Sequence, residues 1–340
     1  MERTFKTAFI GCGGRGREHA QAVKADPRYR VTALTDAKPE AAEAMKKDFF
    51  SDAAVYTDHR EMLNKEKPEI VIVCLWTRLH LPVFRDCISA GAKAVLSEKP
   101  MAPTWGECTE MDALARTSGC QLTFSHQRRF AEGNLLVRKW IKEGLFGDIQ
   151  RLDLTSPPNL LDCGTHTFDQ AFSFLSETPV KWVLTAVDHR DPVNWFDVKA
   201  ESMSVGRLFY ENGVRASFQA GGPDLDIWGG IRVTGSKGFV EVFWDGSFGK
   251  GAVYADPAWS PPAIEACPAD AMKAMVREAL DCLVSGKESE VSSRKALRSA
   301  EVIFACYESV RRHGRVDLPL TGIADNPFIT MLEKGAFEKN

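Results

Sequence analysis

The sequence predicts an α/β fold in two parts: a doubly wound parallel sheet, then an α/β domain with a large, open, mostly antiparallel sheet. In the first 125 residues, strand-like and helix-like stretches alternate over short connections, the pattern of a parallel sheet with helices on both faces. After a helix at 133–143, strand-like stretches dominate. The change predicts two domains, residues 1–125 and 126–340, each long enough to bury its own core.

Each element of the first domain has its own signal. Pro39 suits the first position of a helix, and Gly91 suits a helix stop. The stretch Thr-Trp-Gly-Glu at 104–107 has the pattern of a capping box that begins a further helix. The expected strands are 7–10, 29–35, 70–75, 94–97 and 121–125, and the expected helices are 16–24, 39–49 and 80–90.

In the second domain, β-branched and aromatic residues mark the strands. Asn212 and Gly213 separate two such stretches and predict a two-residue hairpin. The expected strands are 180–187, 202–210, 214–220, 231–234 and 238–244, and helices near 270–285 and 293–312 close the chain.

The composition is that of an ordinary soluble globular protein. The 340 residues carry a net charge of −3 with both signs mixed, so there is no electrostatic reason to expect nucleic acid or an anionic membrane as a partner. No apolar run reaches the roughly 18 residues of a membrane span, and the first residues lack the apolar core of a signal peptide. Nine scattered cysteines without a CxxC pair favour buried thiols in a reducing, cytoplasmic compartment.

A glycine-rich turn follows the first expected strand and opens the first helix. Gly11 permits a tight turn, Gly13 lets the backbone approach a pyrophosphate, and Gly16 lets the helix pack close to the sheet. The helix N-terminus offers free N–H groups and a partial positive charge to phosphates. With the acid Asp36 at the end of the second strand, the pattern predicts a bound dinucleotide.

Asp36 also bears on which dinucleotide binds. A carboxylate at this position accepts hydrogen bonds from both ribose hydroxyls of NAD and repels the 2′-phosphate of NADP. Arg15 and Lys38 lie close enough in sequence to soften that repulsion. NAD is therefore the expected cofactor, with NADP left open.

Lys99 is the first candidate for chemistry. It stands in Glu98-Lys99-Pro100, at the end of the fourth expected strand. Ligands of open α/β sheets bind beyond these strand ends, so the side chain is expected to point toward the cofactor. The alternative is an ordinary surface lysine at a strand end.

A stretch expected to be helical over 162–175 carries the second candidate cluster. Asp162 and His166 lie four residues apart, where the carboxylate can orient the imidazole and raise its basicity, as a general base requires. The alternative is a solvated Asp–His pair. Cys163 and His166 have no second ligand pair at zinc spacing, so no metal is expected. A separate apolar stripe consists of Phe168, Ala171, Phe172 and Leu175.

Together, these clusters resemble the Gfo/Idh/MocA family, named for glucose-fructose oxidoreductase and inositol dehydrogenase. The resemblance covers nearly the whole chain and rests on the glycine turn 11–16, on Glu-Lys-Pro at 98–100, and on the D-x-G-x-H-x-x-D pattern at 162–169. Weaker matches are His80 and Gln-Arg-Arg-Phe at 127–130. In that family a Rossmann domain precedes an α/β domain whose open sheet often forms the oligomer interface, which implies a homodimer or homotetramer.

The resemblance further implies hydride transfer between nicotinamide and a hydroxyl of a sugar, sugar derivative or cyclitol. By position, Lys99 would hydrogen-bond the reacting hydroxyl, His166 would take its proton, and Asp162 would support the pair. The Lys99–Pro100 peptide would be cis. The implied contacts are Gly11, Gly13, Gly14, Arg15, Gly16, Asp36, Leu75, Trp76, His80, Glu98, Lys99 and Gln127 for NAD, and Lys99, Arg128, Asp162 and His166 for the substrate.

The chain departs from the family pattern at three places. Leu75 and Trp76 stand where the family usually has Thr-Pro, so a larger ring either stacks on the cofactor or narrows the pocket. The segment 154–162 is shorter than usual and lacks a glycine run, which predicts a more open substrate site. Gln127 replaces a frequent asparagine.

Two other functions stay open. Some relatives cleave glycosidic bonds by transient oxidation, elimination and re-reduction with recycled NAD, and the short segment before Asp162 favours such a glycosidase. Others act as non-enzymatic, dinucleotide-responsive regulators, such as the galactose-pathway repressor of yeasts. Retention of Lys99 and His166 argues against a regulator, because a binding module needs no base. Arg128 and Arg129 either bind an acidic substrate or form a structural ion pair, and the ion pair is favoured.

Overall fold

The computed structural model describes residues 3–190, 192–195, 197–222 and 228–337. The chain forms two compact units that interleave in sequence. The first unit consists of Met1–Ala102, Glu107–Gln127 and Ala269–Ala296, and the second of Pro103–Gly106, Arg128–Pro268 and Leu297–Asn340.

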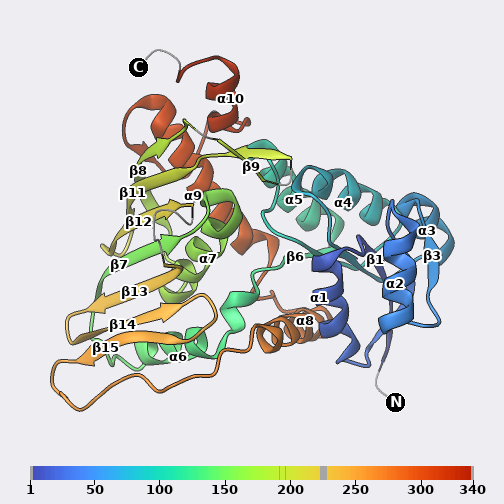
Figure 1. Ribbon diagram of the computed structural model, residues 1–340, viewed down its shortest axis with the longest axis horizontal. Coiled ribbons are helices and arrows are strands. Elements are labelled where there is room, and N and C mark those ends of the chain that lie inside the picture. The colour runs from blue at the N-terminus through green and yellow to red at the C-terminus, as the bar shows by residue number, and fades with distance from the viewer. Residues whose placement is uncertain (1–2, 191, 196, 223–227, 338–340) are drawn as a thin grey trace. The chain divides into compact units, whose positions relative to one another are not determined.

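A six-stranded parallel sheet forms the centre of the first unit (Figure 1). Its strands lie in the order β3-β2-β1-β4-β5-β6, so the direction of winding reverses between β1 and β4. This is the predicted doubly wound sheet, and such sheets bind ligands beyond the strand ends at the reversal. The strands are β1 (Phe5–Ile10), β2 (Tyr29–Thr35), β3 (Ala54–Tyr56), β4 (Ile70–Val73), β5 (Ala94–Ser97) and β6 (Gln121–Phe124).

Most helices that connect these strands were expected, but β3 and the helix after it were not. That helix has the polar sequence HREMLNKE and buries only Met62 and Leu63, so it lacks a long apolar stripe. Its signal is local: the Asp58 side chain accepts a hydrogen bond from the N–H of Arg60 and caps the helix. The helices are α1 (Gly14–Lys24), α2 (Pro39–Phe49), α3 (His59–Glu66), η1 (Thr77–Leu79), α4 (His80–Ser89) and α5 (Trp105–Ser118).

Helix α8 (Pro268–Ser285) lies in the first unit although it follows the strands of the second unit in sequence. The Tyr29 hydroxyl donates a hydrogen bond to the carbonyl of Val276 at 2.7 Å. The Gln121 side chain donates to the carbonyl of Ala279 at 2.8 Å. Side chains at the start of β2 and β6 therefore fix α8 to the parallel sheet.

An eight-stranded mixed sheet forms the centre of the second unit, in the order β15-β14-β13-β7-β12-β11-β8-β16 (Figure 1). β7 and β12 pair in parallel and the other pairs are antiparallel, as predicted for most of the sheet. The strands are β7 (Ile149–Ser156), β8 (Val180–Asp188), β11 (Met203–Tyr210), β12 (Arg215–Gly221), β13 (Gly230–Gly235), β14 (Gly238–Phe243), β15 (Phe248–Val253) and β16 (Val316–Asp317), with a separate pair β9 (Val193–Trp195) and β10 (Val198–Ala200).

The hairpin between β11 and β12 is confirmed, but its loop is longer than the predicted two residues. The N–H of Gly213 donates to the carbonyl of Tyr210, and the N–H of Tyr210 donates to the carbonyl of Val214. Gly213 has a φ of +87°, which favours glycine. The geometry is a turn followed by a left-handed glycine, one of the next most common hairpin loops.

Helices cover one face of the large sheet. Strand residues Leu152, Leu154, Ala216 and Ala220 are buried on that face, and α7 packs on β7 and β13 while α6 packs on β14. The helical elements over residues 127–174 and 293–333 are η2 (Gln127–Phe130), α6 (Glu132–Lys142), η3 (Leu160–Gly164), α7 (Thr165–Phe174), α9 (Ser293–Arg312) and α10 (Pro327–Glu333). Within the described residues, none of the helices has the length and apolar character needed to cross a membrane.

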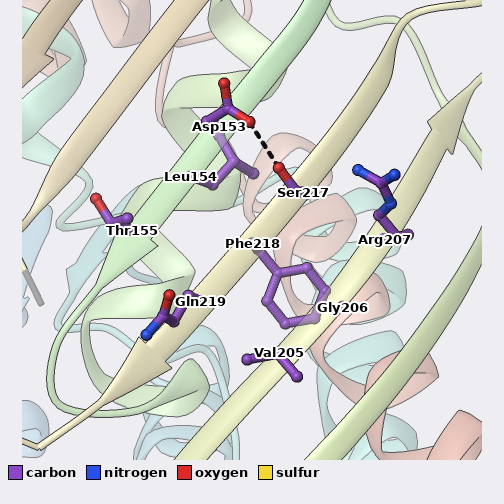
Figure 2. A pocket seen from close by; sticks show the side chains of 9 residues that line it. All are labelled: Asp153, Leu154, Thr155, Val205, Gly206, Arg207, Ser217, Phe218 and Gln219. Atoms are coloured by element: carbon purple, nitrogen blue, oxygen red, sulfur yellow. Dashed lines mark hydrogen bonds between the residues drawn. The ribbon is translucent and has the colours of Figure 1, made fainter. Parts of the chain in front are cut away.

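The opposite face of β7, β11 and β12 carries a shallow hollow of about 500 Å³ (Figure 2). It lies beside Gly206, between Val205 and Arg207 of β11. Asp153 and Ser217 flank it and are joined by a hydrogen bond of 2.7 Å, with Ser217 donating. Thr155, Arg207 and Gln219 also line it together with the exposed side chain of Val205, so this face carries both polar and apolar side chains.

Candidate functional site

The glycine turn after β1 has the geometry that its sequence predicts. Gly11 has a φ of +97°, and a Cβ atom there would lie 2.2 Å from the carbonyl oxygen of Cys74. A Cβ atom on Gly16 would lie 2.2 Å from the carbonyl oxygen of Gly11. Both positions therefore require glycine, the first for the turn and the second for close packing of α1.

Gly13 and Gly14 are different because they border open space. Within the described residues, nothing lies within 4 Å of the place where a Cβ atom would stand on either. Both are exposed, and Gly13 is the N-cap of α1, so the first N–H groups of the helix have no intrahelical acceptor. An anionic group fits this end of the helix sterically and electrostatically.

Asp36 holds the turn in place. Its Oδ2 atom accepts a hydrogen bond from the N–H of Cys12 at 2.8 Å, and its Oδ1 atom accepts one from the N–H of Lys38 at 2.9 Å. The residue is half-buried. A carboxylate oxygen accepts more than one hydrogen bond, so both oxygens retain lone pairs for ligand hydroxyls.

Glu98, directly after β5, is buried among nitrogen donors from α1. Its Oε1 atom accepts hydrogen bonds from Nε and Nη2 of Arg15 at 3.1 and 2.9 Å, and from Nε2 of His19 at 2.8 Å. Burial raises the pKa of Glu98, but the His19 hydrogen bond and the Arg15 charge outweigh burial and hold the pKa well below its usual range. The side chain is therefore an ionised tether between α1 and the Lys99 turn.

The Lys99 turn is fixed on both sides. The Oε2 atom of Glu98 accepts the N–H of Lys99 at 3.2 Å. The Lys99–Pro100 peptide is cis, as predicted. This places Lys99 at the carboxyl end of β5, two strands from β1 in the sheet order.

His80 connects the turn after β4 to the turn after β5. Its Nε2 atom lies 3.1 Å from the carbonyl oxygen of Leu75, and its Nδ1 atom lies 3.1 Å from that of Pro100. Burial lowers the pKa of His80, so the ring is neutral and donates one N–H at a time. Both ring nitrogens therefore face main-chain carbonyls of the first unit. Trp76, in the turn that His80 holds, is 51% exposed.

In the second unit, the expected single helix over 162–175 is wrong in its first turn. Residues Leu160–Gly164 form a π-helical turn, and α7 begins only at Thr165. The N–H of Gly164 donates to the carbonyl of Asn159, five residues back, at 3.0 Å. The side chain of Asn159 accepts the N–H of Asp162 at 2.8 Å. The 100° spacing therefore does not relate Asp162 to His166, since a π turn holds more residues than an α turn.

Asp162 and His166 are both buried, at 5% and 2% exposure. The solvated surface pair is therefore wrong. The expected apolar stripe of α7 is buried as predicted, but so is every other residue of the helix. A carboxylate and an imidazole in such a position are removed from bulk water. Their electrostatic interactions are stronger there than in water, because the protein interior has a lower dielectric constant.

The predicted ion pair at the arginines is confirmed for Arg129. Its Nε and Nη2 atoms donate to the two carboxylate oxygens of Asp169 at 2.6 and 2.8 Å, and its Nη1 atom donates to Glu177 at 2.6 Å. Arg129 is fully buried, so this bidentate pair joins η2 to α7 in the interior. Asp169, the last member of the D-x-G-x-H-x-x-D pattern, thus has a structural partner.

Arg128 points elsewhere. Its guanidinium carbon lies 4.1 Å from the centre of the Trp244 ring, and its Nη2 atom lies 3.5 Å from the sulfur of Cys163. Asn134 donates to the carbonyl oxygen of Arg128 at 2.8 Å. Arg128 and Trp244 therefore form a stacked pair beside the turn that precedes His166.

Comparison with known proteins identifies the family of the chain. Models of an oxidoreductase family match residues 5–126 as the NAD-binding Rossmann fold and residues 153–318 as the C-terminal alpha/beta domain.

The chain belongs to the Gfo/Idh/MocA oxidoreductase family.

Individual relatives are distant. The chain is 29% identical to an uncharacterised oxidoreductase of Schizosaccharomyces pombe over 50% of this chain and 51% of that protein, so it spans about half of that relative's length. It is 26% identical to the scyllo-inositol 2-dehydrogenase (NADP(+)) of Bacillus subtilis over 66% of this chain and 67% of that protein. The WlbA dehydrogenase of Bordetella pertussis, solved with NADH and UDP-GlcNAcA, has the same fold, with a TM-score of 0.80 at 22% identity over 94% of this chain and 99% of that chain.

For this Gfo/Idh/MocA protein, the first unit is an NAD-binding Rossmann domain. The residues at the glycine turn fit that group, because the open helix N-terminus suits a pyrophosphate and Asp36 suits ribose hydroxyls. Among the described residues, His, Cys, Asp and Glu side chains do not gather in groups of three or more that would hold a metal ion.

Sequence analysis missed two residues that the fold brings to these clusters. His19 lies within α1, and helical periodicity gave it no role beyond packing. Trp244 follows β14 and carried no signal beyond general aromatic packing. Their partners, Glu98 and Arg128, are 79 and 116 residues away in sequence, so only the tertiary fold identifies them. Gln127, at the start of η2, is half-buried.

Proposed function

We propose that this oxidoreductase transfers a hydride between NAD and a hydroxyl of a sugar, sugar derivative or cyclitol. The observation that carries the proposal is Lys99 at the carboxyl end of β5, the edge at which a doubly wound NAD-binding sheet binds its ligands. The bound nicotinamide supplies the hydride acceptor or donor. The chain supplies binding, orientation and proton transfer.

We assign the proton transfer to Lys99, His166 and Asp162. In the oxidation direction, His166 would accept the proton of the substrate hydroxyl as the carbonyl forms, and NAD, when bound, would accept the hydride. Lys99 donates a hydrogen bond to the reacting oxygen, and Asp162 orients the imidazole. The burial of Asp162 and His166 supports this, because a carboxylate orients an imidazole more firmly where bulk water does not compete for its hydrogen bonds.

We assign NAD binding to three groups of residues. Gly13, Gly14 and Asp36 contact the cofactor, since they border open space or retain lone pairs. Arg15, His80 and Glu98 act indirectly, because their side chains are already engaged inside the first unit. The other proposed contacts are Gly11, Gly16, Leu75, Trp76, Lys99 and Gln127, with Trp76 offering an exposed ring.

The substrate class follows from the relatives and from Arg128. One relative acts on scyllo-inositol, and the WlbA structure holds a nucleotide sugar acid. We propose that Arg128, stacked on Trp244, contacts the substrate together with Lys99, Asp162 and His166. A planar cation on an aromatic ring suits a hydroxyl-rich or acidic sugar.

The test is an NADH absorbance assay across inositols, aldoses, uronates and aryl glycosides, with NAD and separately with NADP. NADH formation with a polyol or sugar supports the dehydrogenase. Cleavage of an aryl glycoside that requires NAD without net NADH would instead place the protein among the redox glycosidases. Tight NAD binding with no turnover of any compound in the panel would favour a regulator.

We further propose a homodimer or homotetramer through the open face of the large sheet, in a reducing, cytoplasmic compartment. The exposed apolar side chains of Val205 and Leu184 on that face support the first statement. The free thiol state of all nine cysteines, which lie in the described residues, supports the second. Light scattering of the wild type and of Val205→Arg, on that face, tests the interface.

A further inference from the structure

Glu201 is a buried carboxylate to which the proposed mechanism gives no part. It lies between β10 and β11 and is 0% exposed. Its Oε1 atom accepts the N–H of Leu160 at 2.8 Å, and its Oε2 atom accepts the hydroxyl of Tyr307 at 2.5 Å. Leu160 is the first residue of the π turn Leu160–Gly164, so Glu201 meets the chain where that turn begins.

We propose that Glu201 is a positioning residue, which fixes the π turn and thereby places Asp162 for the reaction. The inference rests on the proposed function in one respect, the part of Asp162 in proton transfer. That Glu201 fixes the turn is independent of that function. Both statements concern the second unit alone.

The N–H groups of the π turn need hydrogen-bond acceptors. The first N–H groups of any helical segment have no acceptor within it, and a buried N–H needs one. Glu201 accepts the N–H of Leu160. The Asn159 side chain accepts the N–H of Asp162, and the Asn159 carbonyl accepts the N–H of Gly164. Glu201 is the acceptor in this set that comes from outside the segment, so it determines where the segment sits.

The carboxylate itself is fixed by α9. Tyr307 is fully buried on that helix, and its ring packs against Phe328 with centroids 5.3 Å apart. Its hydroxyl donates to the Oε2 atom of Glu201. A rigid helix thus holds Glu201, and Glu201 holds the turn, which is how supporting groups orient functional side chains.

The contacts of Glu201 are dipoles. Leu160 offers an N–H and Tyr307 an O–H, while Ser204 and Cys306 are its other polar neighbours. Burial raises the pKa of Glu201, and its neutral hydrogen-bond partners offset burial only in part. Hydrogen-bond geometry is therefore what matters, and a glutamine can supply it: its oxygen accepts from Leu160 and its NH₂ donates to the Tyr307 oxygen.

The test compares Glu201→Gln, Glu201→Met and a matched control, Glu301→Met. Glu301 is another largely buried carboxylate of the second unit with a raised pKa, and it accepts the N–H of Leu320 at 2.7 Å. Amide hydrogen exchange of the segment 159–165 is measured by mass spectrometry on the full chain. We expect exchange about tenfold faster in Glu201→Met, and within about threefold of wild type in Glu201→Gln and Glu301→Met.

Turnover separates positioning from general stability. Glu201→Met is expected to lose roughly 10- to 100-fold in kcat on the substrate found by the NADH assay, while Glu201→Gln recovers most of it. NADH affinity, measured by nucleotide fluorescence, is unchanged in both. If Glu201→Met does not fold, Tyr307→Phe replaces it, because it removes only the group that fixes Oε2, and faster exchange at 159–165 is again expected.

The proposal is overturned if the segment 159–165 exchanges in Glu201→Met, or in Tyr307→Phe, at the same rate as in Glu301→Met. Faster exchange with unchanged kcat also overturns it, since the turn would then move without consequence for the reaction. Failure of the proposed function has a different signature: His166→Ala would turn over like wild type, whatever exchange the Glu201 variants show.

Discussion

The two units each contain a buried glutamate close to a proposed functional residue, and the two glutamates have opposite pKa shifts. Glu98 is 4% exposed and Glu201 is 0% exposed, so burial opposes ionisation in both. The pKa of Glu98 is nevertheless lowered, whereas that of Glu201 is raised. The difference lies in the partners: Arg15 and His19 for the first, Leu160 N–H and Tyr307 O–H for the second.

The comparison shows that burial alone does not determine the role of a carboxylate. A nearby cation compensates the lost hydration of the charge, while neutral dipoles compensate it only in part. Glu98 is therefore bound to its partners through charge, and no neutral residue replaces it. Glu201 is bound through hydrogen-bond geometry, and glutamine suffices. Each adjoins a residue of the proposed mechanism in its own unit, since Glu98 precedes Lys99 and Glu201 meets the turn that carries Asp162.

The largest expected effect comes from removing the proposed acid–base groups, one from each unit. Lys99→Ala and His166→Ala should each lower kcat by about 10²–10⁴-fold, the usual contribution of a positioned acid–base group. NADH affinity should change much less, because the glycine turn holds the pyrophosphate. Lys93→Ala, at an exposed lysine just before β5 that pairs with Glu69, is the matched control and should stay within about twofold. A His166 variant with wild-type turnover would remove the imidazole from the chemistry.

Next comes the loss of the Glu98 carboxylate itself. Glu98→Ala leaves Arg15 and His19 without their anion and should destabilise the first unit by about 3 kcal/mol, the lower end for a broken buried pair because Arg15 is partly exposed. Glu201→Gln should cost less than about 1 kcal/mol, because both hydrogen bonds persist. Urea unfolding of both variants checks the contrast. Equal shifts of the two midpoints would contradict it.

Local sequence signals predicted most of the fold. The glycine turn, Pro39 and the strand alternation placed the elements of the doubly wound sheet, because each depends on residues within a few positions of one another. Local sequence signals did not predict elements that are very short, or helices that pack against strands far away in the sequence. β3 has three residues, and α8 returns to the first unit only through contacts such as Tyr29 with Val276.

The motifs propose site residues but not their contacts. Lys99, Asp162 and His166 are proposed from motifs, and the cis peptide at Lys99–Pro100, which the same resemblance implied, is confirmed. The π turn was missed because no periodicity marks it, since its geometry depends on Asn159 and on Glu201, far along the chain. Tertiary contacts therefore determine the geometry of this turn, which residue spacing in the sequence does not predict.

The pH dependence of stability should differ in sign between the two glutamates. Glu98, with its pKa lowered from 4.5, contributes stability that is full above pH 4.5 and is lost as the pH falls toward its folded pKa. Glu201, with its pKa raised from 4.5, contributes stability that is full below pH 4.5 and is lost as the pH rises through its folded pKa.

Urea midpoints between pH 4 and pH 8 test this with Glu98→Gln and Glu201→Gln as references. The difference between wild type and Glu98→Gln should shrink on acidification. The difference between wild type and Glu201→Gln should shrink, or change sign in favour of the variant, on going from pH 4 to pH 8. If both differences in urea midpoint changed with pH in the same direction, the hydrogen-bond partners of the two carboxylates would not explain their opposite pKa shifts.

The smallest expected effect concerns NADP, and it follows from the Glu98 side of the comparison. Arg15 lies near Asp36 in sequence, but its charge is engaged by Glu98 and Glu18, so it does little to offset the repulsion between Asp36 and a 2′-phosphate. NAD should therefore bind more tightly than NADP. Asp36→Ala should narrow the ratio of the two dissociation constants by about tenfold, roughly 1.4 kcal/mol, whereas Arg15→Gln should change it by less than about threefold. Titration calorimetry with both nucleotides measures the ratios.

Equal or tighter NADP binding by the wild type would show that cations near Asp36 outweigh its charge. A large effect of Arg15→Gln on the ratio would identify Arg15 as that cation despite its pairing with Glu98.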